Sequence, residues 1–241
     1  EGKNFEEGYQ LKGYNFKNTE RSLLHNTFKI SQQKENSAIE SISFLAFSLY
    51  NQPDDKRIRT VKDLHAGETS QYVAIIAPSP SVQDAGRLYQ NIHETSFGTK
   101  LLWDKKITSF MPAQTTTKLG IGFDQTLRQF QTRWMSYTMA NSSSFNYELL
   151  SLPISEIFAP THFNDNGFKL QEGTNPSDKY FASQTQAYSF LQVHLKISKL
   201  SILGGLRMES ITQHLSSKNY SNEGVEVHHQ FIHTLPSASV K

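Results

Sequence analysis

Cysteine is absent from the 241 residues, which excludes disulfide bonds and thiolate-based metal or nucleophilic chemistry. The net charge is only +2 at pH 7, and no run of Lys or Arg forms a phosphate-binding stripe, so we expect no nucleic-acid partner. A membrane-spanning helix needs roughly 18 consecutive apolar residues, and the richest apolar runs, 44–50 and 72–78, are far too short. The chain opens at Glu1 with a polar stretch and no secretory signal, so we expect a mature protein or a piece cut from a larger one.

The stretch from Tyr188 to Ser210 is the most informative segment that is present. Apolar and polar residues alternate twice along it. In the first half, the apolar residues are Leu191, Val193, Leu195 and Ile197, and the polar ones are Gln192, His194, Lys196 and Ser198. In the second half, the apolar residues are Leu200, Ile202, Leu206 and Met208, and the polar ones are Ser201, Arg207 and Glu209. Because side chains alternate across a strand with period two, this pattern predicts a β-hairpin that reverses near Ser198–Lys199. One face of the hairpin is apolar and the other is polar and charged. A soluble sheet and a transmembrane barrel with a wet lumen both have such faces.

The lengths of the connections favour the membrane barrel. Further strands are predicted at about 21–33, 40–51, 93–105, 116–134 and 225–232, which makes about seven strands with the hairpin. Short links at 34–37, 106–113 and 198–199 alternate with long ones at 52–91, 135–183 and 213–224. A meander that crosses a bilayer has tight turns on one side and long loops on the other. The predicted fold is all-β: an antiparallel up-and-down meander, part of a transmembrane β-barrel with short periplasmic turns and long extracellular loops. The mean hydropathy of −0.52 is compatible with this fold, because only alternate strand residues need be apolar.

Several motifs resemble those of one protein family. The segment Ala187–Ser210 resembles a hairpin of TonB-dependent outer-membrane receptors, whose second strand carries Gly, Gly-x-Arg-x-Glu; here these residues are Gly204, Gly205, Arg207 and Glu209. Leu235-Pro236-Ser237 is similar to the Leu-Pro-Ser that opens a later strand of these receptors, and His93–Ile107 and the Gly120, Gly122, Arg128 pattern are similar to preceding barrel strands. In general texture the chain looks closest to Bacteroidetes-like receptors.

This resemblance implies that residues 1–241 form one partial β-barrel domain, the middle part of a barrel of about 22 strands, without the plug domain. It implies a cell outer-membrane receptor for a scarce nutrient such as an iron–siderophore complex. The implied partners are outer-membrane lipid, the TonB system acting through the missing plug, and a small nutrient ligand. The alternative is a soluble β-rich ligand- or carbohydrate-binding module. Leu191, Val193 and Leu206 would form an exposed apolar band in a membrane barrel and a closed core in a soluble module.

The candidate site residues are charged or polar side chains on the predicted polar face. We expect Lys100, Asp124, Arg128, His194, Arg207 and Glu209 to face the lumen, where ion pairs such as Arg207–Glu209 support the sheet. The ligand-binding residues are unknown, although Tyr, Phe and Asn side chains between 145 and 168 are candidates. Asp54, Asp55 and Glu172 are predicted to be solvated loop charges.

No catalytic chemistry is predicted. The sequence has no Gly-x-Ser-x-Gly elbow and no phosphate-binding loop, so we expect neither an enzyme nor a cofactor. His228, His229 and His233 are candidate metal ligands, because imidazole is the commonest metal-binding side chain. His229 and His233 share a strand face but lie about 13 Å apart at roughly 3.3 Å per residue, too far to bind one ion. We therefore expect solvated strand histidines and no metal site.

Overall fold

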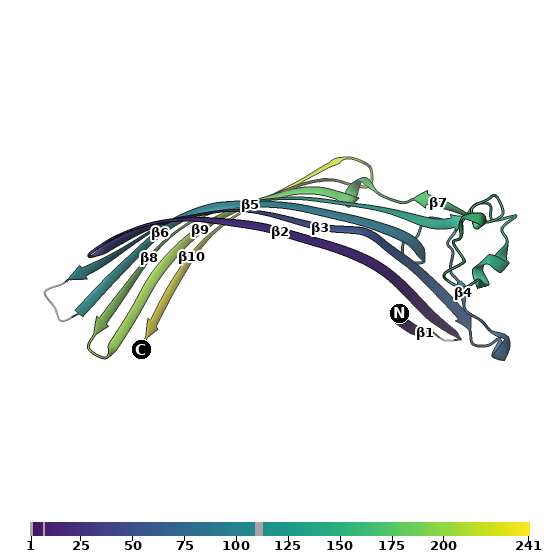
Figure 1. Cartoon of the computed structure of the whole chain (residues 1–241), viewed down its shortest axis with the longest axis horizontal. Helices are drawn as coiled ribbons and strands as arrows, with labels where there is room; N and C mark the ends of the chain where they lie inside the picture. The colour runs from purple at the N-terminus through teal and green to yellow at the C-terminus, as the bar shows by residue number, and fades with distance from the viewer. Residues whose placement is uncertain (1, 7, 109–112) are drawn as a thin grey trace. The chain divides into compact units, whose positions relative to one another are not determined.

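The structure is a computed structural model that describes residues 2–6, 8–108 and 113–241 (Figure 1). Its strands are β1 (Gly2–Glu6), β2 (Tyr9–Lys34), β3 (Ser37–Asp63), β4 (Val73–Ala74), β5 (Ala85–Thr108), β6 (Ala113–Met139), β7 (Phe168–Glu172), β8 (Lys179–Ile197), β9 (Leu200–Lys218) and β10 (Gly224–Val240). Short 3-10 turns are η1 (Gly67–Thr69), η2 (Tyr147–Ser151), η3 (Pro160–His162) and η4 (Pro176–Asp178). None of the helical turns in this part of the chain is long and apolar enough to cross a membrane.

The strands form one sheet in the order β1-β2-β3-β5-β6-β8-β9-β10, with β4 added to β3 and β7 added to β6. The ladders β1–β2, β8–β9 and β9–β10 are antiparallel, as are the additions of β4 and β7. Consecutive long strands are neighbours throughout, whether a tight turn or one of the long connections joins them. The prediction of an all-β, antiparallel up-and-down meander is confirmed.

The strands are longer than the sequence pattern predicted, and three short strands were missed. β3 and β5 extend far into the predicted loop 52–91 and reduce it to residues 64–84. The connection 140–178 contains β7 and three of the 3-10 turns. The expected long segment 213–224 was wrong: β9 and β10 pair up to Lys218 and Gly224, which leaves a compact turn over residues 219–223. The alternation is lost there because polar residues, Thr212, His214 and Ser216, continue the face of β9 that is apolar before them, while Leu215 lies on the other face.

Leu235-Pro236-Ser237 does not open a strand, as the resemblance implied, but lies within β10. Pro236 is paired with Leu206 of β9. Proline has no N–H to donate to a ladder and is therefore confined mostly to edge strands. β10 is the last strand of the sheet order, so its other side has no ladder among the described residues that Pro236 would interrupt.

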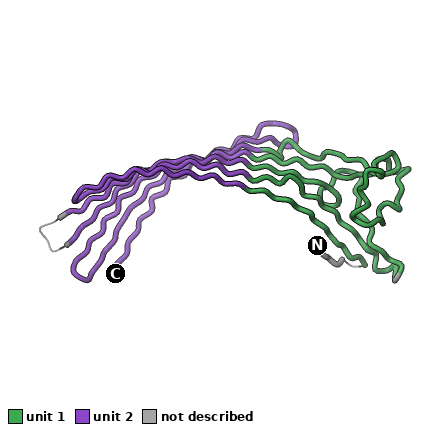
Figure 2. The backbone as a smooth tube through the Cα atoms, viewed as in Figure 1, with its two compact units in different colours: residues 1–21, 50–92, 130–179 green, residues 22–49, 93–129, 180–241 purple. Residues whose placement is uncertain are grey.

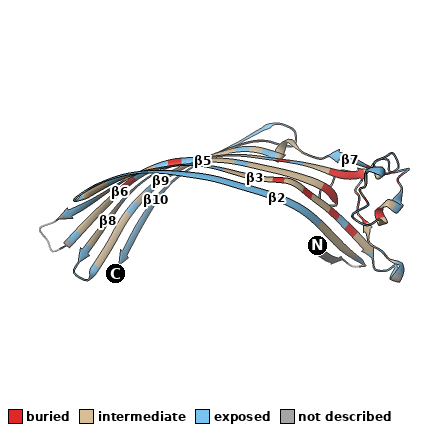
Figure 3. Ribbon diagram, viewed as in Figure 1, coloured by how far each residue is buried: buried red, intermediate tan, exposed pale blue. Residues whose placement is uncertain are grey.

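The chain divides into two compact units (Figure 2). Unit 1 comprises residues 1–21, 50–92 and 130–179, and unit 2 comprises residues 22–49, 93–129 and 180–241. The apolar core belongs to unit 1, where the two long connections pack together (Figure 3). Its buried members are Ala74, Ile76, Ala85, Tyr137, Phe145, Leu150, Ile157 and Phe168.

Unit 2 has no buried apolar side chain among its described residues. Directly opposed residues of neighbouring strands share a face, and the register pairs Leu191 with Leu206 and Leu195 with Ile202. Leu191, Leu206 and Met208 keep 46%, 47% and 50% of their surface exposed. The same face carries Phe97, Leu101 and Trp103 of β5 and Leu119, Ile121 and Phe123 of β6, all exposed. We call this surface the apolar face of unit 2; it is an exposed band and not a closed core.

The short turns of unit 2 follow the predicted order. Residues 35–36 connect β2 to β3, and Ser198–Lys199 connects β8 to β9. The backbone N–H of Lys106 donates to the carbonyl of Asn36 at 2.8 Å, which places the end of β5 beside the first turn. Ser198 has a φ of +52°, as the first position of a tight hairpin turn requires. Half of the predicted link 106–113, residues 109–112, lies outside the described residues.

Candidate functional site

The six predicted lumen residues share one face of unit 2, opposite the apolar face. A Cβ added to Gly98 would overlap the Asp124 carboxylate, and one added to Gly122 would overlap the Tyr188 ring, so these residues of β5, β6 and β8 project on the same side. Tyr188 is paired with Glu209, which extends this side to β9. The set consists of Lys100, Asp124, Arg128, His194, Arg207 and Glu209. We call it the polar face of unit 2.

Charges on the polar face are paired with their neighbours. Arg207 Nε donates to Glu209 Oε1, and the Arg207 guanidinium lies 4.0 Å from the Tyr188 ring centre. Arg128 Nε donates to Glu94 Oε2 at 2.7 Å. Both arginines therefore have an acidic partner. Their support of the sheet remains a prediction.

Of the remaining three predicted residues, Asp124 lies near both Lys100 and Arg207, whose charges act on it, and His194 lies apart. His194 Nε2 lies 2.7 Å from Ser201 Oγ, near the β8–β9 turn. Lys100 and Asp124 line a hollow of about 250 Å³ together with His25 and Phe44, whose rings are stacked. The structure thus places the six residues on one surface without joining them in a single site.

Glycines of β6 make room for aromatic rings of β8. A Cβ at Gly120 would overlap the Phe190 ring, as one at Gly122 would overlap the Tyr188 ring. Glycine within a strand is typical of such close approach. The sequence showed the Gly120–Gly122 spacing but not its cause, because the rings come from a strand about 70 residues later.

A second hollow of about 540 Å³ lies on unit 2. Its polar lining includes Glu94, Arg128, Tyr180, Gln184, Gln213 and His229. Gln213 Nε2 donates to Gln184 Oε1 at 2.8 Å across its floor. This volume falls within the range of small-molecule sites. Apart from Arg128, sequence reasoning did not single out these residues for a site.

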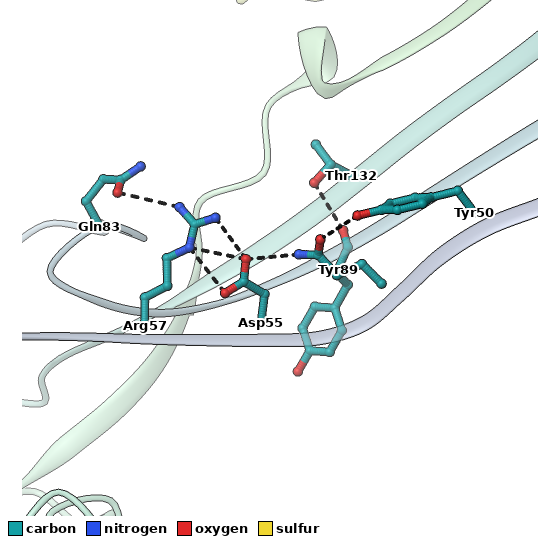
Figure 4. Close-up of polar contacts among 7 residues, drawn as sticks. Tyr50, Asp55, Arg57, Gln83, Tyr89 and Thr132 are labelled. Atoms are coloured by element: carbon teal, nitrogen blue, oxygen red, sulfur yellow. Dashed lines mark hydrogen bonds and ion pairs between the residues drawn. The ribbon is translucent and has the colours of Figure 1, made fainter. Parts of the chain in front are cut away.

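Unit 1 contains a buried polar network around Asp55 (Figure 4). Asp55 is 1% exposed and accepts hydrogen bonds from Gln52 Nε2 at 3.0 Å and from Arg57 Nη2 at 2.8 Å. Tyr50 donates to Gln52 at 3.1 Å, and Arg57 Nη1 donates to Gln83 at 3.5 Å. Each buried polar group of the network has a hydrogen-bond partner. The network therefore stabilises the fold, and none of its buried groups is left to bind a ligand.

Beside this network, unit 1 presents two cations against aromatic rings. Arg87 binds Asp54 through two hydrogen bonds, Nε to Oδ1 at 3.1 Å and Nη2 to Oδ2 at 2.7 Å. Lys56 Nζ lies 5.5 Å from the Phe158 ring centre, and Phe158 stacks on Tyr137 at 3.9 Å. We call Lys56, Arg87, Tyr137 and Phe158, with Asp54, the cation–aromatic cluster.

Burial shapes the ionisation of this cluster. It lowers the pKa of Lys56, and the nearby positive charge of Arg87 lowers that pKa further. Burial also raises the pKa of Tyr137, so the phenol stays protonated. The hydrogen bond to Asp54 raises the pKa of Arg87, which keeps its charge. The cluster can therefore present an anchored cation, Arg87, and a second amine, Lys56, to a ligand, a combination suited to an anionic or aromatic molecule. Tyr137 is buried and supports the cluster from the core.

Some expectations about the long connections were wrong. Asp55 is a buried strand residue of β3 and not a solvated loop charge. Glu172 is a solvated charge as expected, but it belongs to β7 and not to a loop, and it accepts hydrogen bonds from Arg133 at 2.9 and 3.0 Å. Phe145 and Phe168 are core residues of unit 1, so they are not available to a ligand, whereas Tyr147 remains 60% exposed. Local pattern could not reveal these roles, because each partner comes from a distant segment.

Comparison with known proteins gives only remote similarity. No family model matches the chain, and no curated protein matches it. Among solved structures, the ferric citrate transporter FecA in its unliganded form is similar over 96% of this chain and 33% of its own length, at 9% identity and a TM-score of 0.46. The siderophore receptor PiuA from Acinetobacter baumannii is similar over 96% of this chain and 45% of its own, at 9% identity and a TM-score of 0.27. The chain spans less than half the length of either protein.

Proposed function

We propose that this chain contributes consecutive strands to the transmembrane barrel of a TonB-dependent outer-membrane receptor. The observation that carries the proposal is the exposed apolar face of unit 2, which is opposed by a charged face and has no buried apolar side chain behind it in the described residues. Water would not tolerate such a continuous apolar surface, whereas lipid requires it. The short turns are then periplasmic, and the long connections of unit 1 are extracellular.

The dimensions of the apolar face fit a bilayer. From Leu200 to Met208, β9 rises by roughly 26 Å at about 3.3 Å per residue. With the usual tilt of about 35–45°, the apolar stretch covers roughly 20 Å of membrane, close to the ~25 Å band of outer-membrane barrels. Beyond Met208 the same face becomes polar with Ser210, Thr212 and His214. This change marks the outer limit of the lipid contact.

The receptor role rests on the motif resemblance of the β8–β9 hairpin to TonB-dependent receptors and on the cation–aromatic cluster of unit 1; the Bacteroidetes-like character rests on general texture alone. We place the ligand contact at this cluster, because two cations beside aromatic rings suit a small anionic nutrient such as an iron–siderophore complex. Transport would draw its energy from the TonB system through a plug domain. The chain itself acts as receptor wall and binding surface and not as an enzyme.

The soluble binding module would require the apolar residues of β8 and β9 to pack into a core. None of the described residues of unit 2 forms one. No observation favours this alternative.

Uptake measurements on the full-length receptor test the proposal. Cells that produce the receptor should accumulate a labelled ferric siderophore only when TonB is present, and the receptor should resist urea extraction from outer membranes. Lys56→Ala and Arg87→Ala should each weaken ligand binding about tenfold, the loss expected for a charge-assisted contact of about 1.5 kcal/mol. Arg59→Ala, an exposed cation of the same strand as Lys56, is the matched control and should leave binding unchanged. Recovery of the receptor in the soluble fraction would refute the membrane assignment.

A further inference from the structure

Three potential metal ligands lie together at one end of the β9–β10 ladder. The register pairs His214 directly with His228, and Glu226 with Ser216, so His214, His228 and Glu226 project from one face of two adjacent strands. The two imidazole rings are stacked with their centres 4.2 Å apart, and His214 Nε2 contacts Glu226 Oε2. Because an imidazole nitrogen binds an ion in the plane of its ring, one of the two rings must rotate about its side-chain torsions for both to bind the same ion. One ligand atom from each of the three residues lies within 4.8 Å of the other two.

The chemistry of this cluster suits a transition metal. Imidazole nitrogen combined with a carboxylate oxygen is a donor set for Zn²⁺ and the other late first-row divalent ions, not for Ca²⁺ or Mg²⁺. Ser216 Oγ donates to Glu226 Oε1 at 2.7 Å, which orients the carboxylate and leaves Oε2 directed at His214. Such outer hydrogen bonds commonly fix the ligands of metal sites.

We propose that His214, Glu226 and His228 form a surface site for one divalent transition-metal ion, with Zn²⁺ as its probe. Three protein ligands leave at least one coordination position for water or for another donor. His214 is half-buried and the other two ligands are exposed, so the ion can enter from solution. The site lies past Met208, where the residues on this side of β9 become polar, and next to the turn at 219–223. It shares no residue with the cation–aromatic cluster of unit 1. It does not depend on the proposed transport function.

The proposed site departs from the expectation that His228, His229 and His233 are solvated strand histidines without a metal, although His229 and His233 still take no part in it. These residues alternate with His228 along β10 and therefore project from its opposite face, where His229 is paired with Gln213. The proposed site joins His228 to a residue of β9 instead. Its composition depends on the strand register, which the sequence pattern does not give.

Titration calorimetry with ZnCl₂ on the detergent-purified full-length protein, without a polyhistidine tag, tests the site. The unmodified protein should bind Zn²⁺ in a saturable step. His214→Gln, His228→Gln and Glu226→Gln should each weaken this step by about tenfold or more. His229→Gln, a neighbouring histidine on the opposite face, is the matched control and should bind like the unmodified protein. Replacing Zn²⁺ by Co²⁺ should give visible absorption bands of a nitrogen- and oxygen-ligated ion that disappear in the His228→Gln variant.

Circular dichroism of each variant keeps the result interpretable. Glu226 and His228 are exposed, so their substitution should leave the β-sheet signal unchanged even if His214→Gln disturbs folding. The proposal is overturned if folded Glu226→Gln and His228→Gln proteins bind Zn²⁺ as the unmodified protein does. It is equally overturned if the unmodified protein shows no saturable binding, or if His229→Gln loses as much affinity as His228→Gln.

Discussion

The role of a charged residue in this protein depends on how deeply its side chain is buried. Asp55 is fully buried and accepts hydrogen bonds from Gln52 and Arg57. The neighbouring Asp54 binds Arg87, and about a third of the Asp54 and Arg87 side chains is exposed. Adjacent carboxylates of β3 therefore serve different purposes: Asp55 organises the interior of unit 1, and Asp54 fixes a cation at its surface. The sequence predicted the same solvated role for both, since nothing local distinguishes them.

The first prediction concerns this difference. Asp55→Ala removes the acceptor of Arg57 and Gln52, and we expect it to lower the free energy of unfolding by about 2–3 kcal/mol. This value is below the usual cost of breaking a buried ion pair, because Arg57 is partly exposed and can be rehydrated. Asp54→Ala should cost about 0–1 kcal/mol, as exposed pairs do. Urea unfolding of the two variants measures the difference, and an equal loss of stability would show that burial of Asp55 is unimportant.

The second prediction concerns the glycine–ring contact between β6 and β8. Gly122→Ala places a methyl group where the Tyr188 ring lies, so we expect a loss of about 1–3 kcal/mol from overpacking. Gly204→Ala is the control, because a Cβ there meets nothing within 4 Å. In the Tyr188→Ala background the cost of Gly122→Ala should vanish, and a double-mutant cycle of unfolding free energies measures this coupling. An unchanged cost in that background would assign the effect to the backbone instead.

At the scale of elements, the β8–β9 hairpin and the polarity of its faces could be predicted from the sequence. Period-two alternation is strong there because one face is apolar and the other is charged. This alternation weakens where the strands leave the apolar region. For that reason segment 213–224 was predicted to be a long connection, although most of it is paired strand. The cation–aromatic cluster could not be predicted, since Lys56, Arg87 and Tyr137 come from three different strands and are about 30 to 80 residues apart in the sequence. Their meeting depends on the core of unit 1.

The third prediction compares two adjacent positions of β8. Val193→Arg places a charge on the apolar face and should destabilise the receptor in bilayers by about 2–4 kcal/mol. His194→Arg projects from the polar face, beside Ser201, and should cost little. Folding efficiency into liposomes, measured by the heat-dependent shift in gel mobility, compares them. Equal tolerance of the two arginines would contradict the face assignment.

At the scale of the whole molecule, the described sheet runs from β1 to β10 as an open path. Backbone groups inside a bilayer must be paired, so only a closed barrel or helices can span it. The two ends of the path present unpaired strand edges, which also favour aggregation. Strands outside these 241 residues would have to complete the barrel.

The fourth prediction follows from this open path. The isolated 241-residue chain, reconstituted in liposomes, should neither conduct solutes nor transport ligand. Solute-release assays and protease digestion of the proteoliposomes measure this. Protease-resistant insertion with solute flux would show that these residues close into a small barrel by themselves.

The central claim is that the apolar face of unit 2 contacts lipid, and spin labelling along β9 tests it most directly. The absence of native cysteine allows single cysteines to be introduced and labelled without background. In the full-length receptor in bilayers, labels at positions 202, 206 and 208 should be accessible to dissolved oxygen and shielded from a water-soluble nickel complex. Labels at 201, 207 and 209 should show the reverse. Equal accessibility of both sets to the nickel complex would contradict the membrane barrel.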